Sequence, residues 1–142
     1  SHPVQLYIYD LSNGMARMLS RQLTGTHFDA IYHTSVVVHG VEWFFGAGIQ
    51  SASPGKTHHG APMEVHPLGS TALDAQGVAQ LVRELAPRFQ ASDYHLLRHN
   101  CNNFSDVLGR RLTGQGVPAH VSSLPADFLS TPFGQMMAPQ ID

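Results

Sequence analysis

Three stretches near the start of the chain carry the side-chain pattern of β-strands. Residues 4–9 (VQLYIY) alternate aliphatic with polar or aromatic side chains, and residues 31–38 (IYHTSVVV) are mostly β-branched. His39-Gly40 is typical of a two-residue hairpin turn, after which residues 41–45 (VEWFF) return as a strand. The sequence therefore predicts one strand followed by an antiparallel hairpin.

Three other stretches predict helices. A short helix is expected over residues 15–23, with Ser12 or Asn13 as its cap and Gly25 at its end. A second helix, over residues 73–86, follows Ser70-Thr71 and stops at Pro87. Its apolar positions at helical spacing are Val78, Leu81, Val82 and Leu85. A third begins near Cys101 and ends before Gly114, with one face formed by Phe104, Val107, Leu108 and Leu112.

The remaining segments complete a mixed pattern. Residues 46–48 (GAG) end the hairpin, residues 51–62 predict a loop, and residues 63–66 predict a short strand. Residues 93–97 are expected to be extended, and residues 123–137 to form a helix with a Pro-Phe-Gly break. This order, with an antiparallel hairpin in its middle, predicts a single α+β domain over residues 1–142.

Composition narrows the class of protein. The chain is 42% hydrophobic and 13% charged, with a formal net charge of −2, so it lacks the basic footprint of a nucleic-acid-binding protein. One cysteine cannot form an internal disulfide, which favours a reducing compartment. The first residues lack the features of a signal peptide, and no apolar run reaches the ~20 residues of a membrane span. The expected location is the cytoplasm or the nucleus.

The single cysteine has polar neighbours, in RHNCNNFSD (residues 98–106). Asn100 is a strong helix cap, so Cys101 would lie in the first turn, where free N–H groups and the helix dipole favour an anion. A thiolate there is expected to have a lowered pKa and to be nucleophilic near neutral pH. The alternative is a buried structural thiol. The polar neighbours, and a position one turn before the apolar stripe, favour a functional role.

A thiolate nucleophile needs a base, which is normally histidine. Among ten histidines, His33 stands out because it lies inside a strand that can hold an imidazole still. His99 lies in the chain entering the helix, and His58-His59 is interpreted as a solvated surface pair. The histidines without distinguishing context are His27, His39, His66, His95 and His120.

A metal site around Cys101 is a second alternative to a catalytic thiol. His95, His99 and Cys101 bring two ligand types together within seven residues. Structural zinc sites favour several cysteines, and this chain has one. We therefore expect no metal and no other cofactor.

Four segments together resemble the PPPDE family of permuted papain-like cysteine peptidases, and most of all its desumoylating isopeptidase (DeSI) branch. They are YDLSNGMARMLS, YHTSVVVHGVEWFFGAGI, LLRHNCNNFSDVLGRRLTG and LPADFLSTPFGQMM, in that order along the chain. By this resemblance Cys101 matches the family's nucleophile and His33 its general base. The order of the two, histidine first, fits a circular permutation. The resemblance implies a small antiparallel sheet or barrel packed against helices, with the cysteine at a helix N-terminus.

The resemblance also implies an activity. It is cleavage, through an acyl-enzyme, of the isopeptide bond between a ubiquitin-like modifier, chiefly SUMO, and a target lysine. The same pair can serve a deubiquitinase or a protein S-acyl thioesterase, and a non-catalytic adaptor is a further alternative. The Cys101 backbone N–H is an expected oxyanion donor. Asn100 and Asn102 are candidates for a second donor, although Asn100 can equally act only as a cap. The branch implies a homodimer.

The hairpin register tests for a third catalytic residue. With His39-Gly40 as the turn, paired residue numbers sum to 79, which places Gly46 opposite His33 and Glu42 opposite Val37. Glu42 would then lie roughly 13 Å from His33 and cannot orient its imidazole. We expect a dyad, or an orienting group from another part of the chain.

Two residues are candidates for a substrate groove. Gly46 opposite the base is expected to leave space for a substrate backbone. Trp43 is expected to face away from Phe44 and Phe45 and to form a groove wall, whereas Phe44 and Phe45 are expected in the core.

Overall fold

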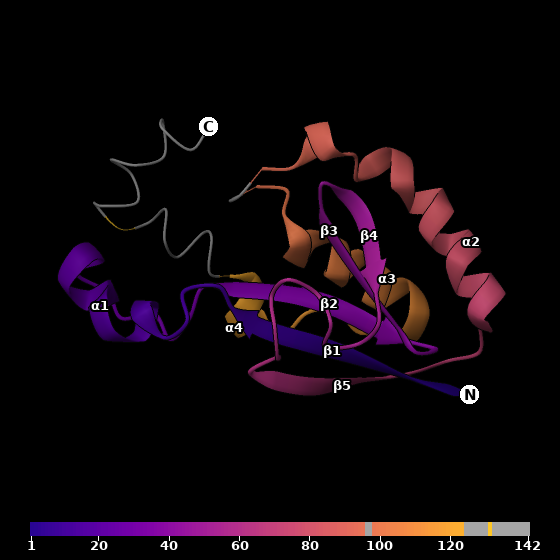
Figure 1. Cartoon of the computed structure of the whole chain (residues 1–142), viewed down its shortest axis with the longest axis horizontal. Helices are drawn as coiled ribbons and strands as arrows, with labels where there is room; N and C mark the ends of the chain where they lie inside the picture. Colours follow the sequence, from indigo (N-terminus) through magenta and orange to yellow (C-terminus); the bar gives the residue numbers. More distant parts are fainter. Residues whose placement is uncertain (96–97, 124–130, 132–142) are drawn as a thin grey trace.

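Five antiparallel strands form one open sheet in the order β4-β3-β2-β1-β5 (Figure 1). The computed structural model of the chain describes residues 1–95, 98–123 and 131. The strands are β1 (His2–Asp10), β2 (Tyr32–Val38), β3 (Val41–Gly46), β4 (Gly48–Ala52) and β5 (Glu64–Thr71). Among the described residues, β4 and β5 are the two edges of a sheet that does not close, so the barrel alternative is wrong. The sheet and the helices packed on it confirm the α+β prediction.

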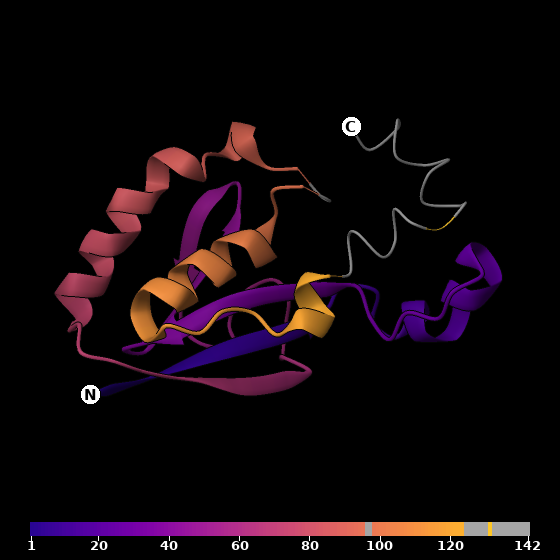
Figure 2. The same cartoon turned by 180° about the vertical axis from the view of Figure 1, so that it is seen from behind.

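The helices surround this sheet unevenly. They are α1 (Met15–Thr24), α2 (Ala75–Leu85), α3 (Cys101–Thr113) and α4 (Ala119–Ser122), with 3₁₀ turns η1 (Ala86–Arg88) and η2 (Ala91–Asp93). Helix α3 lies across one face of the sheet, and α1 projects from the end of the sheet away from α2 (Figures 1 and 2). Within the described ranges, no helix has both the length and the apolar character needed to cross a membrane.

The elements nearest the cysteine follow the sequence closely. The β2–β3 pairs Val38–Val41, Val37–Glu42 and Val36–Trp43 have the predicted register. Helix α3 begins at Cys101 behind an Asn100 cap and ends at Gly114, whose φ of 84° suits a glycine. The hairpin and the helix that carry the candidate site are therefore confirmed.

Other elements differ from the prediction. Strand β4 occupies residues expected to begin a loop, and β5 continues past His66 through Ser70-Thr71. The cap of α2 is consequently Asp74, which accepts a hydrogen bond from the Gly77 N–H at 2.8 Å. The prediction of an extended segment over residues 93–97 is correct in part. Asp93 ends η2, Tyr94 is extended and His95 forms a β-bridge with His99, while residues 96–97 lie outside the described residues. The tail helix expected over residues 123–137 lies outside the described residues, apart from Ser123 and Thr131.

The hydrophobic core lies between one sheet face and helices α2 and α3. Buried core side chains from the sheet include Val4, Leu6, Ile8, Val36, Val38 and Phe45, and those from the helices include Leu81, Leu85, Phe104 and Leu108. Each such side chain stabilises the fold by roughly 1.5–3 kcal/mol relative to an exposed position. This core fixes α3 against the sheet, and with it the cysteine at its first turn.

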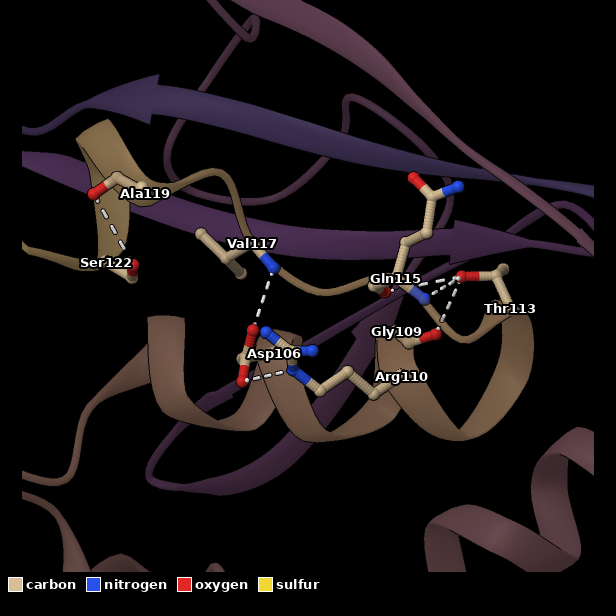
Figure 3. Close-up of polar contacts among 8 residues, drawn as sticks. All are labelled: Asp106, Gly109, Arg110, Thr113, Gln115, Val117, Ala119 and Ser122. Atoms are coloured by element: carbon tan, nitrogen blue, oxygen red, sulfur yellow. Dashed lines mark hydrogen bonds and ion pairs between the residues drawn. The ribbon is translucent and has the colours of Figure 1, made fainter.

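The far end of α3 is fastened to the chain that follows it (Figure 3). The Asp106 carboxylate accepts hydrogen bonds from the Val117 N–H at 2.9 Å and from Arg110 Nε at 3.0 Å. Gly116 passes so close that an added methyl group would overlap the Asp106 carboxylate and the Arg110 guanidinium. The helix is thus held along its length and not only at its start.

Candidate active site

Helix α3 takes the place of β3 beside the first half of β2. The β2–β3 ladder stops at Val36, which leaves the backbone groups of Tyr32 and Thr34 without a strand partner on that side. Asn102 Nδ2 donates to the Tyr32 carbonyl at 3.1 Å, and Ser105 Oγ donates to the Thr34 carbonyl at 3.1 Å. The Thr34 N–H lies against the Cys101 sulfur. Side chains from one turn of α3 therefore complete the hydrogen bonding of the strand edge.

A second contact locks the same turn. Thr34 Oγ1 donates to Asn102 Oδ1 at 2.7 Å, so both polar ends of the Asn102 amide are engaged with β2. Cys101 and Ser105 are four residues apart and therefore share one helix face. Both are buried, contrary to the expectation that Cys101 precedes the buried stripe.

The Cys101 thiol is buried but has polar surroundings. Its residue is 3% exposed. The backbone N–H groups of Thr34, Asn102 and Cys101, and the Tyr94 hydroxyl, lie close enough to favour a thiolate. Burial outweighs them and raises the pKa of the thiol to about 11. The expected lowering of this pKa by the helix N-terminus is thus wrong for the resting site, because the loss of hydration is the larger effect.

The His33 imidazole lies in a different set of contacts. Its ring stacks on that of His59, with centroids 3.7 Å apart, and lies near the rings of Tyr9 and Phe44 at 5.5 and 5.8 Å. Its Nε2 is 3.4 Å from Ser35 Oγ. Burial, followed by the neighbouring His59 and His58, lowers the pKa of His33 to about 3. The imidazole is therefore neutral at physiological pH.

The structure thus brings the two predicted catalytic residues to neighbouring positions without pairing them. The sulfur lies against the N–H of Thr34, the residue next to His33. Among the described residues, no hydrogen bond joins the sulfur to the imidazole; the thiol is 3.8 Å from Asn102 Oδ1. The resting site holds a neutral thiol and a neutral imidazole.

The two asparagines have structural partners. Asn100 Oδ1 accepts hydrogen bonds from the N–H groups of Asn102 and Asn103 at 2.9 and 3.4 Å, while Asn103 Oδ1 accepts from the Asn100 N–H at 2.7 Å. This reciprocal cap confirms the capping role of Asn100. Asn102 joins α3 to β2, as described above. That either residue is an oxyanion donor stays a prediction.

The groove candidates lie elsewhere than expected. Trp43 is half-buried against the core and shares that side of β3 with Phe45, whereas Phe44 faces the histidines. Gly46 pairs with Gly48 in the β3–β4 hairpin and not with His33, because the β2–β3 ladder ends first. A Cβ at Gly46 would lie 3.1 Å from Gln50 Oε1, so the expected open space is occupied.

Two features near His33 did not follow from the sequence: the burial of Glu42 and the position of His59. Glu42 is fully buried and accepts hydrogen bonds from the Tyr9 hydroxyl at 2.6 Å and from the Gly55 N–H at 2.9 Å. It lies opposite Val37, as predicted, and has no described contact with the His33 ring. His58-His59 was predicted to be a solvated pair: His58 is exposed, but His59 is partly buried and stacks on the His33 ring. No local pattern could reveal this, because the loop reaches His33 only after folding.

The segment before α3 positions Tyr94. The backbones of His95 and His99 exchange hydrogen bonds of 2.8 and 3.0 Å, and the His99 ring stacks on Phe89 at 4.8 Å. The Tyr94 ring packs 5.1 Å from Phe45. Burial, followed by the neighbouring Cys101, raises the pKa of Tyr94 to about 12, so its hydroxyl remains a donor beside the sulfur. In the described part of the chain, no cluster of three or more His, Cys, Asp or Glu side chains is arranged to hold a metal ion.

Comparison with known proteins identifies the fold family. Residues 2–142 match the family model described as "PPPDE putative peptidase domain". The chain is 43% identical to desumoylating isopeptidase 1 of Homo sapiens over 143 aligned positions, covering 99% of this chain and 85% of the relative. It is 41% identical, with the same coverage, to desumoylating isopeptidase 1 of Xenopus laevis, and 30% identical to the DeSI-like protein sdu1 of Schizosaccharomyces pombe, covering 85% of this chain and 63% of the relative. With this match over nearly its whole length and these relatives, the chain belongs to the PPPDE peptidase family.

Proposed function

We propose that this chain is a cysteine isopeptidase that removes a ubiquitin-like modifier, chiefly SUMO, from target lysines. The observation that carries the proposal is the docking of the α3 first turn on β2, which sets the Cys101 sulfur against the backbone next to His33. Similarity to two desumoylating isopeptidases over 99% of the chain supports the substrate class.

The proposed reaction uses one proton acceptor and one nucleophile. His33 accepts the thiol proton, and the sulfur attacks the carbonyl carbon of the modifier's C-terminal glycine. The carbonyl electrons move to oxygen, where the Cys101 N–H is a donor at the helix start. The tetrahedral intermediate collapses by breaking the C–N bond, and imidazolium transfers its proton to the departing lysine amine. Water then hydrolyses the thioester and restores the thiol.

The resting geometry adds a condition to this reaction. Since thiol and imidazole are both neutral and not hydrogen-bonded, proton transfer becomes favourable only when the His33 ring reaches the sulfur. Catalytic hydrogen bonds are often loose in unliganded sites and tighten in the substrate complex. Cys101 is 3% exposed, so the residues that bury the sulfur also have to move before a substrate carbonyl can reach it. We therefore expect turnover to depend on the whole modifier rather than on a short peptide.

The test compares three substrates with the wild-type chain, two site variants and one control variant. A SUMO–lysine isopeptide conjugate is expected to be cleaved, and Cys101→Ser and His33→Gln are each expected to lower kcat/KM by at least ~10³. His27→Gln, at an exposed position, is the matched histidine control and is expected to leave the rate unchanged. Cleavage of a ubiquitin conjugate alone, or of an acyl thioester alone, would contradict the SUMO assignment. No Cys101-dependent reaction with any of them would favour the adaptor.

We also propose that the protein acts in the cytoplasm or nucleus, as a homodimer. A thiol nucleophile has to stay reduced, which supports the first. The second comes from the family resemblance alone. Fractionation of tagged protein and sedimentation velocity test the two points; a monomer at micromolar concentration would contradict the dimer.

A further inference from the structure

Three imidazole rings are layered on the sheet face opposite the core. His33 lies innermost and is 3% exposed, His59 stacks on it with an interplanar angle of 24°, and His58 lies 4.0 Å from His59. The Phe44 ring meets all three edge-on, at 5.7 to 6.3 Å. We call these three side chains the histidine stack. The stack places solvent-facing titratable groups directly on the proposed catalytic base.

The loop that carries His58 and His59 is held in place by a hydrogen bond to a buried side chain of the sheet. Residues 53–62 are anchored where the Gly55 N–H donates to the buried Glu42, whose other oxygen accepts the Tyr9 hydroxyl. Within this loop, Thr57 Oγ1 lies 3.2 Å from His59 Nδ1 and accepts the His59 N–H at 3.2 Å. The His59 ring therefore has a defined position over His33, and Glu42 acts on the base indirectly by fixing the loop.

Several ionisable groups around the histidine stack influence the pKa of its members. Burial and the adjacent His58 lower the pKa of His59, and the Glu42 carboxylate opposes them. The other ionisable groups on this side are Tyr9 of β1, whose pKa burial and Glu42 raise, its neighbour Tyr7, and Lys56, which is exposed in the loop. Glu42 is the carboxylate whose charge acts on both His59 and Tyr9. In mild acid the histidines are the groups that gain charge.

Resting on the proposed isopeptidase function, we propose that His59 is a positioning residue for the reaction: its neutral ring holds the His33 imidazole in place, and a proton on His59 disables His33 as a base. During catalysis His33 becomes an imidazolium, and a second positive charge about 4 Å away opposes that step. The same ring that fixes the base at neutral pH therefore turns it off in acid.

Two substitutions separate the ring from its charge. His59→Phe keeps a flat ring over His33 and removes the titratable group, whereas His59→Ala removes both. His27→Phe, at an exposed position away from the stack, is the matched control. The histidine Cε1–H resonances are followed by NMR from pH 7.5 down to the onset of acid unfolding, with His33 assigned from His33→Gln. His33 is expected to be more protonated in both His59 variants than in the wild type at every acid pH. Superimposable titrations would overturn the proposal, with or without isopeptidase activity.

Kinetics provide the second readout. At pH 7.5, His59→Phe is expected to keep the wild-type kcat, and His59→Ala to lose severalfold because the imidazole is no longer held. The ratio of kcat/KM at pH 5.5 to that at pH 7.5 is expected to rise severalfold in His59→Phe. An unchanged ratio in an active enzyme would refute the positioning role. If no substrate turns over but the NMR shift is found, the proposed function fails and the histidine stack still sets the charge of His33.

Discussion

The depressed pKa of His33 makes a prediction about stability in acid. The folded protein holds this imidazole neutral, with a pKa of about 3, whereas an unfolded chain protonates it near pH ~6.5. The unfolded state therefore binds one more proton than the folded state between those values. The neutral His33 therefore contributes stability that is fully present above pH ~6.5 and is lost as the pH falls toward 3.

The size of this effect follows from the two pKa values. Between pH 7.5 and pH 5.0, protonation of His33 in the unfolded state alone lowers the free energy of unfolding by about 2 kcal/mol. The variant His33→Gln lacks the group, so its loss over the same interval is expected to be smaller by that amount. The other histidines contribute to both proteins and cancel in the comparison.

Urea unfolding at the two pH values measures this difference. Trp43 is the single tryptophan and is half-buried against the core, so its fluorescence reports unfolding. The free energies are compared at equal m-values, which keeps the denatured states comparable. A difference below ~0.5 kcal/mol would refute the neutral, buried imidazole. A difference of opposite sign, with the wild type relatively more stable in acid, would instead show a preformed thiolate–imidazolium pair.

Three other substitutions test the site. Asn102→Ala leaves the Thr34 hydroxyl and the Tyr32 carbonyl without their α3 partner, and urea unfolding is expected to show a loss of about 2–4 kcal/mol. Tyr94→Phe removes the hydroxyl beside the sulfur, which is expected to lower kcat/KM up to about tenfold while thermal melting shows little change. Gly116→Ala forces a methyl group into Asp106 and is expected to cost about 1–3 kcal/mol in the same unfolding assay.

Local signals were sufficient for the elements that carry the site. The β-branched run of β2, the His39-Gly40 turn and the Asn100 cap each specify structure over a few residues, and all three are present. The register followed from the turn alone, since the period of a strand leaves one pairing once the turn is fixed. Strand β4 was missed because Gln50 and Ser51 carry no apolar alternation, and pairing with β3 defines it.

Contacts between distant segments could not be predicted in this way. Asn102 and Thr34 are 68 positions apart, and the sequence around either residue does not indicate that the other is its partner. The predicted lowering of the thiol pKa is wrong for the same reason. The Asn100 cap can be predicted from the sequence, but the burial that raises the pKa comes from the packing of α3 on the sheet. The sequence predicts a surface position for His59 because its loop contains no apolar pattern that would place it over β2.

Substitution of a helix turn for a strand beside β2 makes the reactive group depend on complete folding. The sulfur gains the Thr34 N–H as a neighbour only when β2 and α3, which are far apart in the sequence, have met. In a partly unfolded chain Cys101 lacks the contact with β2. The arrangement around the sulfur is therefore a property of the folded chain and not of the segment around Cys101 alone.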